Sequence, residues 1–222
     1  VQGDVLSQSL RLDPETEDER SYDVDISYQK TFEEKGRKWT ASAKFISSRD
    51  GERSDISQFN TIDVADTIFQ RVYNDENQTR WLFETDYVHP FEKGVKIETG
   101  FRTNLRDITN NYLVEQKDVD KWEVFRGIQD SLSYKENVIA GYFQLGHKIG
   151  KFSWQAGLRS EYTIIDAVSA LEGATASRNY IDFFPSVFLS YDLGKDYSVQ
   201  VSYSRRLSRP WFRQLLPFSN FS

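Results

Sequence analysis

"YDVDISYQKTFEEKGRKWTASAKF", from Tyr22 to Phe45, contains two alternating segments joined by a short turn around Gly36. Nearly every second residue of the first segment is apolar: Tyr22, Val24, Ile26, Tyr28 and Phe32. The second segment repeats the pattern with Trp39, Ala41, Ala43 and Phe45. A period of two residues indicates a strand whose faces meet different surroundings, so the stretch predicts a β-hairpin.

The same alternation recurs along the chain, and we find no helix of useful length. Further strands are predicted in the segments 79–91, 95–106, 138–149, 152–164, 179–192 and 197–204, and Val1 to Leu10 resembles the end of an earlier strand. Together these give about nine strands. The fold class that we predict is therefore all-β, with consecutive strands running antiparallel.

The connections alternate between short and long. The short ones carry Gly and Lys and lie at 33–37, 92–94, 146–151 and 193–196. The long ones are polar and lie at 13–20, 47–78, 107–135 and 166–178. This order predicts an up-and-down sheet with all short turns on one side and all long loops on the other, as in transmembrane β-barrels.

The residue types on each face indicate which solvent each face meets. Aromatic residues flank the short turns, and charged residues occupy the opposite face, where we expect Glu98, Arg102, Arg159 and Glu161 to line a water-filled lumen. The sequence thus favours the wall of a transmembrane barrel. A soluble β-sandwich or lipocalin-like barrel also alternates, and it remains the alternative.

Aromatic and basic residues at the strand ends are candidates for membrane-interface anchors. Such side chains place an apolar body in lipid and a polar end in water. The candidates are Trp39, Trp154, Tyr203, Arg205, Arg206, Arg209 and Trp211.

Composition excludes several classes of function. The net charge of −6 over 222 residues argues against nucleic acid as a partner. Without cysteine there is no disulfide framework or thiolate metal site. The chain lacks Met even at position 1, which suggests a piece of a longer reading frame.

Catalytic and metal sites are not indicated, and we expect no cofactor and no enzymatic activity. His89 and His147 adjoin short turns and have no nucleophile motif nearby. The acidic segments 13–20 and 73–78 lack the ligand spacing of a calcium loop. In the segment 110–127, Tyr112, Trp122 and Phe125 could stack on a sugar, although we favour a small hydrophobic cluster.

Four motifs occur in order between Trp81 and Phe218. They are "DYVHPFEKGVKIETGFR" (86–102), "WQAGLRSEYT" (154–163), "NYIDFFPSVFLSYDL" (179–193) and "YSRRLSRPWFRQLLPF" (203–218). Together they resemble the outer-membrane β-barrel family allied to TonB-dependent receptors. The resemblance implies a large barrel of some 22 strands in the outer membrane of a Gram-negative bacterium.

The resemblance also implies a plug domain, a segment that contacts TonB, and energy-coupled uptake of a siderophore, glycan or similar nutrient. We find neither plug nor TonB-contacting sequence, so residues 1–222 are expected to be a partial barrel domain of an import protein. The expected partners are outer-membrane lipid, the remaining strands and plug of the parent protein or a partner chain, and TonB through the parent. A structural, adhesive or secretion-associated barrel is the alternative function.

An incomplete barrel wall has unpaired edges, and lipid cannot satisfy the backbone groups of such an edge. We therefore expect both edges to pair with further strands, with another copy of the chain, or with a partner.

Overall fold

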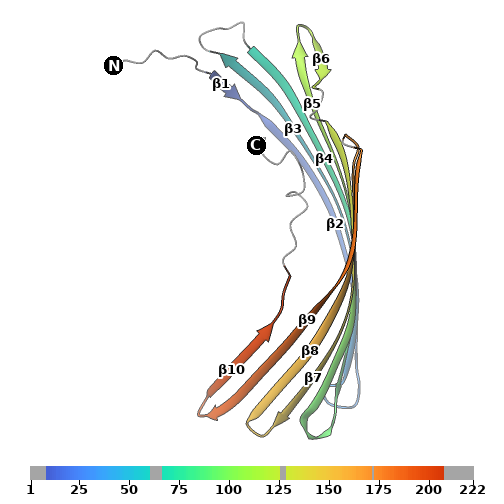
Figure 1. Ribbon diagram of the computed structural model, residues 1–222, viewed down its shortest axis with the longest axis vertical. Helices are drawn as coiled ribbons and strands as arrows, with labels where there is room; N and C mark the ends of the chain where they lie inside the picture. Colours follow the sequence, from blue (N-terminus) through green and yellow to red (C-terminus); the bar gives the residue numbers. More distant parts are fainter. Residues whose placement is uncertain (1–8, 61–66, 126–128, 172, 208–222) are drawn as a thin grey trace, which may run out of the picture.

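A computed structural model describes residues 9–60, 67–125, 129–171 and 173–207, which form one antiparallel sheet (Figure 1). Its ten strands are β1 (Ser9–Leu12), β2 (Glu15–Thr31), β3 (Lys38–Asn60), β4 (Thr67–Pro90), β5 (Val95–Asp118), β6 (Lys121–Val124), β7 (Asp130–Ile149), β8 (Phe152–Ser169), β9 (Ala174–Gly194) and β10 (Tyr197–Ser204). A single 3₁₀ turn, η1 (Glu92–Gly94), joins β4 to β5. The predicted all-β class is confirmed.

The ten strands occupy eight positions in the sheet, because two positions are each filled by a short strand together with a long one. Both β1 and β2 pair with β3, and Asp13 and Pro14 interrupt the strand between them. Similarly, β6 and β7 both pair with β5. Each position otherwise neighbours the next along the chain, so the up-and-down topology is also confirmed.

The four short turns all lie at one end of the sheet, the lower end in Figure 1. In the turn between β4 and β5, the Phe91 amide donates to the Val95 carbonyl at 2.7 Å. Gly94 has a φ of +81°, and a Cβ there would lie 2.8 Å from the Lys148 carbonyl oxygen. Glycine is therefore required at this turn, both by its conformation and by the adjacent strand.

The predicted long loops are wrong, because most of their residues belong to strands. The segment 47–78 instead continues β3 to Asn60 and restarts as β4 at Thr67. The segment 107–135 forms the end of β5, all of β6 and the start of β7, and 166–178 is divided between β8 and β9. The segment 13–20 likewise belongs mostly to β2.

These extensions escaped prediction because their outer face is mostly polar and only some inner positions, among them Ile56, Ile108 and Leu132, are apolar. In register, Tyr22, Ser47, Thr79, Asp107 and Lys135 lie in line across five strands on one face. Water on the outer side removes the regular apolar–polar alternation, yet the backbone hydrogen bonds of the ladder continue. A strand whose outer face meets water therefore has nearly the composition of a loop.

The two faces of the curved sheet differ in burial, although the described residues form only one layer (Figure 1). All the buried side chains lie on one face: Ile56, Ile108, Asn110, Val114, Leu132, Tyr134, Glu136, Val138, Ala140 and Thr163. Side chains converge on the concave face of a curved sheet and diverge on the convex face, so we call the buried face the inner wall. No second layer packs on the described sheet, and the soluble sandwich alternative is wrong.

The convex outer face carries an apolar band. Register aligns Ile26, Ala43, Phe83, Thr103, Ile139, Tyr162 and Ile181 across seven strands of this face. Phe101, Phe143 and Leu158 lie in neighbouring rows and are 46%, 52% and 49% exposed. We call this belt, which extends from Phe152 to Ile164 along β8, the outer band. Among the described residues, no helix has the length and apolar character needed to cross a membrane.

Candidate functional site

The inner wall opposite the outer band carries a polar cluster that spans β4 to β9. Two adjacent rows of the register supply it. We define the inner-wall cluster as Glu84, Asp86, Arg102, Tyr142, Arg159, Glu161 and Asp182.

The ion pairs of the cluster are short. Arg102 Nη1 lies 2.8 Å from Glu84 Oε1 on the neighbouring strand, so the pair crosses from β5 to β4. Arg159 Nε lies 2.7 Å from Glu161 Oε1, two residues along β8, where the glutamate side chain is 12% exposed. Charge-assisted hydrogen bonds of this length fix both partners in one geometry.

Tyr142 makes the longest reach in the cluster. Its hydroxyl crosses β5 from β7 and donates to Asp86 Oδ1 on β4 at 2.6 Å. The ring passes over Gly100, where an added Cβ would lie 2.4 Å from Tyr142 Cε1 and 2.5 Å from Asp86 Oδ1. Gly100 therefore creates the space through which two non-adjacent strands are joined, an aromatic side chain covering a strand glycine.

Tyr142→Phe is expected to destabilise the folded protein by about 1 kcal/mol, because it removes one hydrogen bond to a carboxylate that lumen water can partly solvate. Unfolding of the intact protein by urea in lipid vesicles measures the change. Tyr162→Phe removes a hydroxyl from the outer face and serves as the control. Equal effects of the two variants would contradict the role assigned to the Tyr142 hydroxyl.

The predicted lumen residues all lie on the inner wall. Glu98 pairs with Lys96 along β5, and the other three take part in the two ion pairs above, with Glu84 as the fourth member. Sequence reasoning missed the bridge between Asp86 and Tyr142, because it depends on the register of three strands. Gly100, a glycine inside an alternating strand, was the available signal.

The predicted anchors are distributed between both faces. Trp39 and Trp154 lie on the outer face, near the short turns, and Tyr203 lies on the same face and is 64% exposed. Arg205 instead turns to the inner wall: it donates to the Phe183 carbonyl at 3.0 Å and lies 3.4 Å from Asp182 Oδ1. Arg206 is exposed, and Arg209 and Trp211 lie outside the described residues.

Above the outer band, the inner wall becomes acidic. Glu19, Asp50 and Glu76 lie in one row across three strands, and Glu17 lies opposite Glu52. Repulsion by Glu52 raises the pKa of Glu15 above its ordinary value. No group of three or more His, Asp or Glu in the described part of the chain has an arrangement that could hold a metal ion.

The two histidines contact residues in or near the short turn between β4 and β5. The Tyr87 hydroxyl lies 3.1 Å from His89 Nδ1, and His147 Nε2 lies 3.0 Å from the Lys93 carbonyl oxygen. The segment 110–127, which was expected to be a loop, is mostly strand: Tyr112 belongs to β5 and Trp122 to β6. The Arg71 guanidinium lies 3.9 Å from the centre of the Trp122 ring.

Solved structures similar to this chain include two receptors and one transporter for ferric compounds. The ferric preacinetobactin receptor BauA from Acinetobacter baumannii is 11% identical, with a TM-score of 0.55, over 86% of this chain and 31% of its own. The ferric-catecholate import receptor Fiu from K12 E. coli is 12% identical over 77% and 33%, and the ferric citrate transporter FecA is 13% identical over 75% and 26%, both with TM-scores of 0.49. The chain thus spans about a third or less of these proteins. At this identity, BauA shows a shared fold.

No curated protein matches the chain. The sequence profile of the outer membrane protein beta-barrel family, however, matches residues 30–222, which covers most of the molecule. The outer band, the inner wall and the uniform placement of the short turns agree with this match. The chain therefore belongs to the outer membrane protein beta-barrel family, and it is located in the outer membrane of a Gram-negative bacterium.

Proposed function

We propose that this chain is part of the wall of an outer-membrane import receptor for a nutrient such as a siderophore or a glycan, and that it acts by binding, without catalysis. The observation that carries the proposal is the inner-wall cluster, where charged and polar side chains are locked in pairs at 2.6–2.8 Å. A plug that fills a wide lumen needs a wall of fixed polar groups.

Charge balance in the cluster supports the same proposal. Glu84, Glu161 and Asp182 pair with Arg102, Arg159 and Arg205, and Asp86 accepts from Tyr142. Such a wall offers remaining lone pairs and N–H groups to a docked surface without presenting a strong field of one sign. A plug or cargo can therefore bind there and still be released.

The two edges of the sheet indicate which partners the chain needs. β1 and β2 pair only with β3, and β10 only with β9, so the described strands do not close into a barrel. The free edges are proposed to pair with further strands of the same barrel, which also encloses the plug and reaches TonB. Unpaired backbone groups in hydrocarbon each cost several kcal/mol, on the order of a broken hydrogen bond or more, which favours closure.

Nutrient growth assays on a strain without the gene test the proposal. Loss of growth on one siderophore as iron source, or one glycan as carbon source, is expected, and wild-type protein should restore it. The variant Glu84→Gln/Arg102→Gln removes one ion pair of the inner wall at constant net charge and should lower uptake. Arg53→Gln/Asp55→Asn is the matched control, because its pair, 3.1 Å apart, lies on the outer face above the outer band.

Coupling to TonB is tested by repeating uptake after TonB is deleted, which should abolish transport. If growth on every nutrient persists without the gene while adhesion or envelope integrity is lost, the structural or adhesive barrel is the correct function. Purified protein is expected to leave the transported nutrient chemically unchanged.

A further inference from the structure

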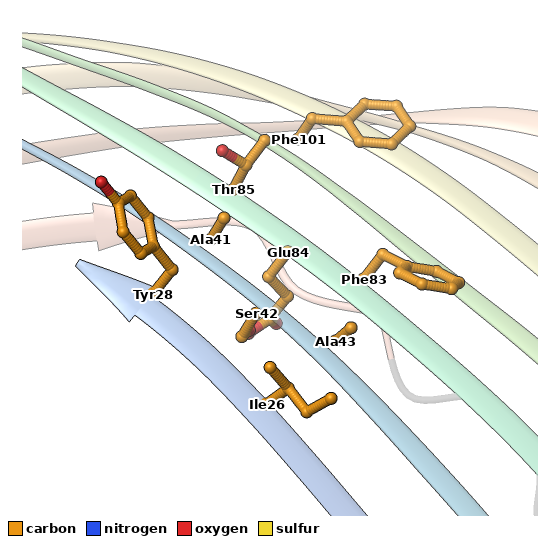
Figure 2. Close-up of a pocket in the computed structure, with 9 residues that line it drawn as sticks. All are labelled: Ile26, Tyr28, Ala41, Ser42, Ala43, Phe83, Glu84, Thr85 and Phe101. Atoms are coloured by element: carbon orange, nitrogen blue, oxygen red, sulfur yellow. The ribbon is translucent and has the colours of Figure 1, made fainter. Parts of the chain in front are cut away.

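A groove crosses the outer face between β2 and β5 (Figure 2). Ala41 and Ala43 form its floor, and Tyr28, Phe83 and Phe101 stand around them. Register explains the shape, because Ala41 lies between Tyr28 and Thr85 and has only a methyl group to fill the space. We call this hollow, with a volume of about 390 Å³, the rim groove.

The interior of the rim groove is mostly apolar. Ser42 and Glu84 also border it, but their register positions face the inner wall, where Glu84 pairs with Arg102, and the outward-facing Thr85 is already satisfied. Thr85 Oγ1 accepts from Trp39 Nε1 at 2.8 Å and donates to the Thr40 carbonyl at 3.1 Å. Trp39 also contacts Tyr28, with ring centres 5.6 Å apart. The groove is therefore a slot for hydrocarbon on a surface that already faces lipid.

Two cations lie beside the groove at its end nearest the short turns. Lys30 shares a row with Trp39 and Tyr87, one step from the row of Tyr28 and Ala41, and all face outward. The Lys30 Nζ and Arg37 Cζ atoms lie 5.1 and 4.4 Å from the centre of the Phe32 ring.

Arg37 is held in place by neighbouring side chains, whereas the Lys30 ammonium group is available to bind an anion. Arg37 Nε donates to the Tyr87 hydroxyl at 2.8 Å, and its Nη1 lies 3.1 Å from Glu34 Oε2. No carboxylate among the described residues lies within ion-pair distance of Lys30. The site thus combines one ammonium and one guanidinium group, aromatic faces at the interface, and an apolar slot that leads into the hydrocarbon.

We propose that the rim groove binds an anionic phospholipid of the inner leaflet, with its phosphate between Lys30 and Arg37 and one acyl chain over Ala41 and Ala43. The short turns of such barrels face the periplasm, so this end of the groove meets the headgroups of the inner leaflet. Positive side chains at the headgroup level select lipids of negative charge.

Native mass spectrometry of the intact protein in detergent, titrated with phosphatidylglycerol and with phosphatidylcholine, tests the site. Phosphatidylglycerol should bind more tightly. Lys30→Gln, which leaves the contact between Arg37 and Tyr87 in place, should weaken that binding about fivefold, and Lys30→Gln/Arg37→Gln about tenfold, since Glu34 already offsets part of the Arg37 charge. The control, Lys148→Gln/Lys195→Gln, removes two cations near other short turns and should change little.

Ala41→Leu tests the acyl chain separately, because it fills the slot and keeps both cations. It should weaken phosphatidylglycerol binding by a similar factor. Equal binding of the two lipids, equal losses in the Lys30/Arg37 variant and its control, or unchanged binding by Ala41→Leu would each overturn the proposal.

Discussion

Phe143→Arg is expected to destabilise the folded protein by about 2–4 kcal/mol, the cost of an arginine on the lipid face near the bilayer midplane. Phe143 lies on the outer face of β7 with 52% of its surface exposed, close to the centre of the outer band. The guanidinium would have to enter hydrocarbon or bend the chain toward the interface.

The neighbouring residue provides the matched control. Gln144 lies on the inner wall opposite Glu98, so Gln144→Arg places the same charge, one residue away, beside a carboxylate in a wet lumen. This variant should fold with nearly wild-type stability. Urea unfolding in lipid vesicles, followed by tryptophan fluorescence, gives both values. A larger loss for Gln144→Arg would reverse the assignment of the two faces.

Gly100→Ala is expected to cost about 3 kcal/mol, because the new methyl group overpacks the wall and displaces the Tyr142 hydrogen bond. The added Cβ would lie 2.4 Å from the Tyr142 ring and 2.7 Å from the Thr85 carbonyl oxygen. The ring can rotate away, but the backbone oxygen is held by the ladder. Part of the penalty therefore remains in the double variant Gly100→Ala/Tyr142→Ala.

Gly141→Ala is the control for this prediction. Gly141 lies on β7 beside Tyr142, the register partner of Gly100, but it points to the outer face. An added Cβ at Gly141 would meet only the Gly100 carbonyl oxygen, at 4.0 Å. We expect this substitution to be neutral or to stabilise the protein by about 0.4–1 kcal/mol, because it restricts the unfolded chain. Equal destabilisation by the two alanines, in the same urea experiment, would show that the crowding at Gly100 is not the cause.

The sequence predicted those features that depend on one strand at a time. Alternation at Trp39, Ala41 and Ala43 identified the outer face, and the turns around Gly36 and Gly94 were located correctly. These signals are local, since side-chain direction in a strand follows from its period of two residues.

Features that depend on register could not be predicted in this way. Tyr142 and Asp86 are 56 residues apart, and only the pairing of β4, β5 and β7 brings them together. Arg205 was expected at the membrane interface, yet its ion pair with Asp182 depends on how β9 lies beside the end of β10. Side-chain spacing within one strand carries no information on its neighbour's offset.

The longest strands, β3, β4 and β5, are more than twice as long as the membrane requires. β4 has 24 residues and extends roughly 80 Å along its own direction, whereas about 9–11 residues cross the hydrocarbon. The parts of these strands that extend beyond the hydrocarbon form a hydrogen-bonded sheet in water, with carboxylates on its inner side. In the proposed import receptor, a solute from outside the cell would meet these carboxylates before it reaches the depth of the lipid, so selection by size and charge would begin above the bilayer.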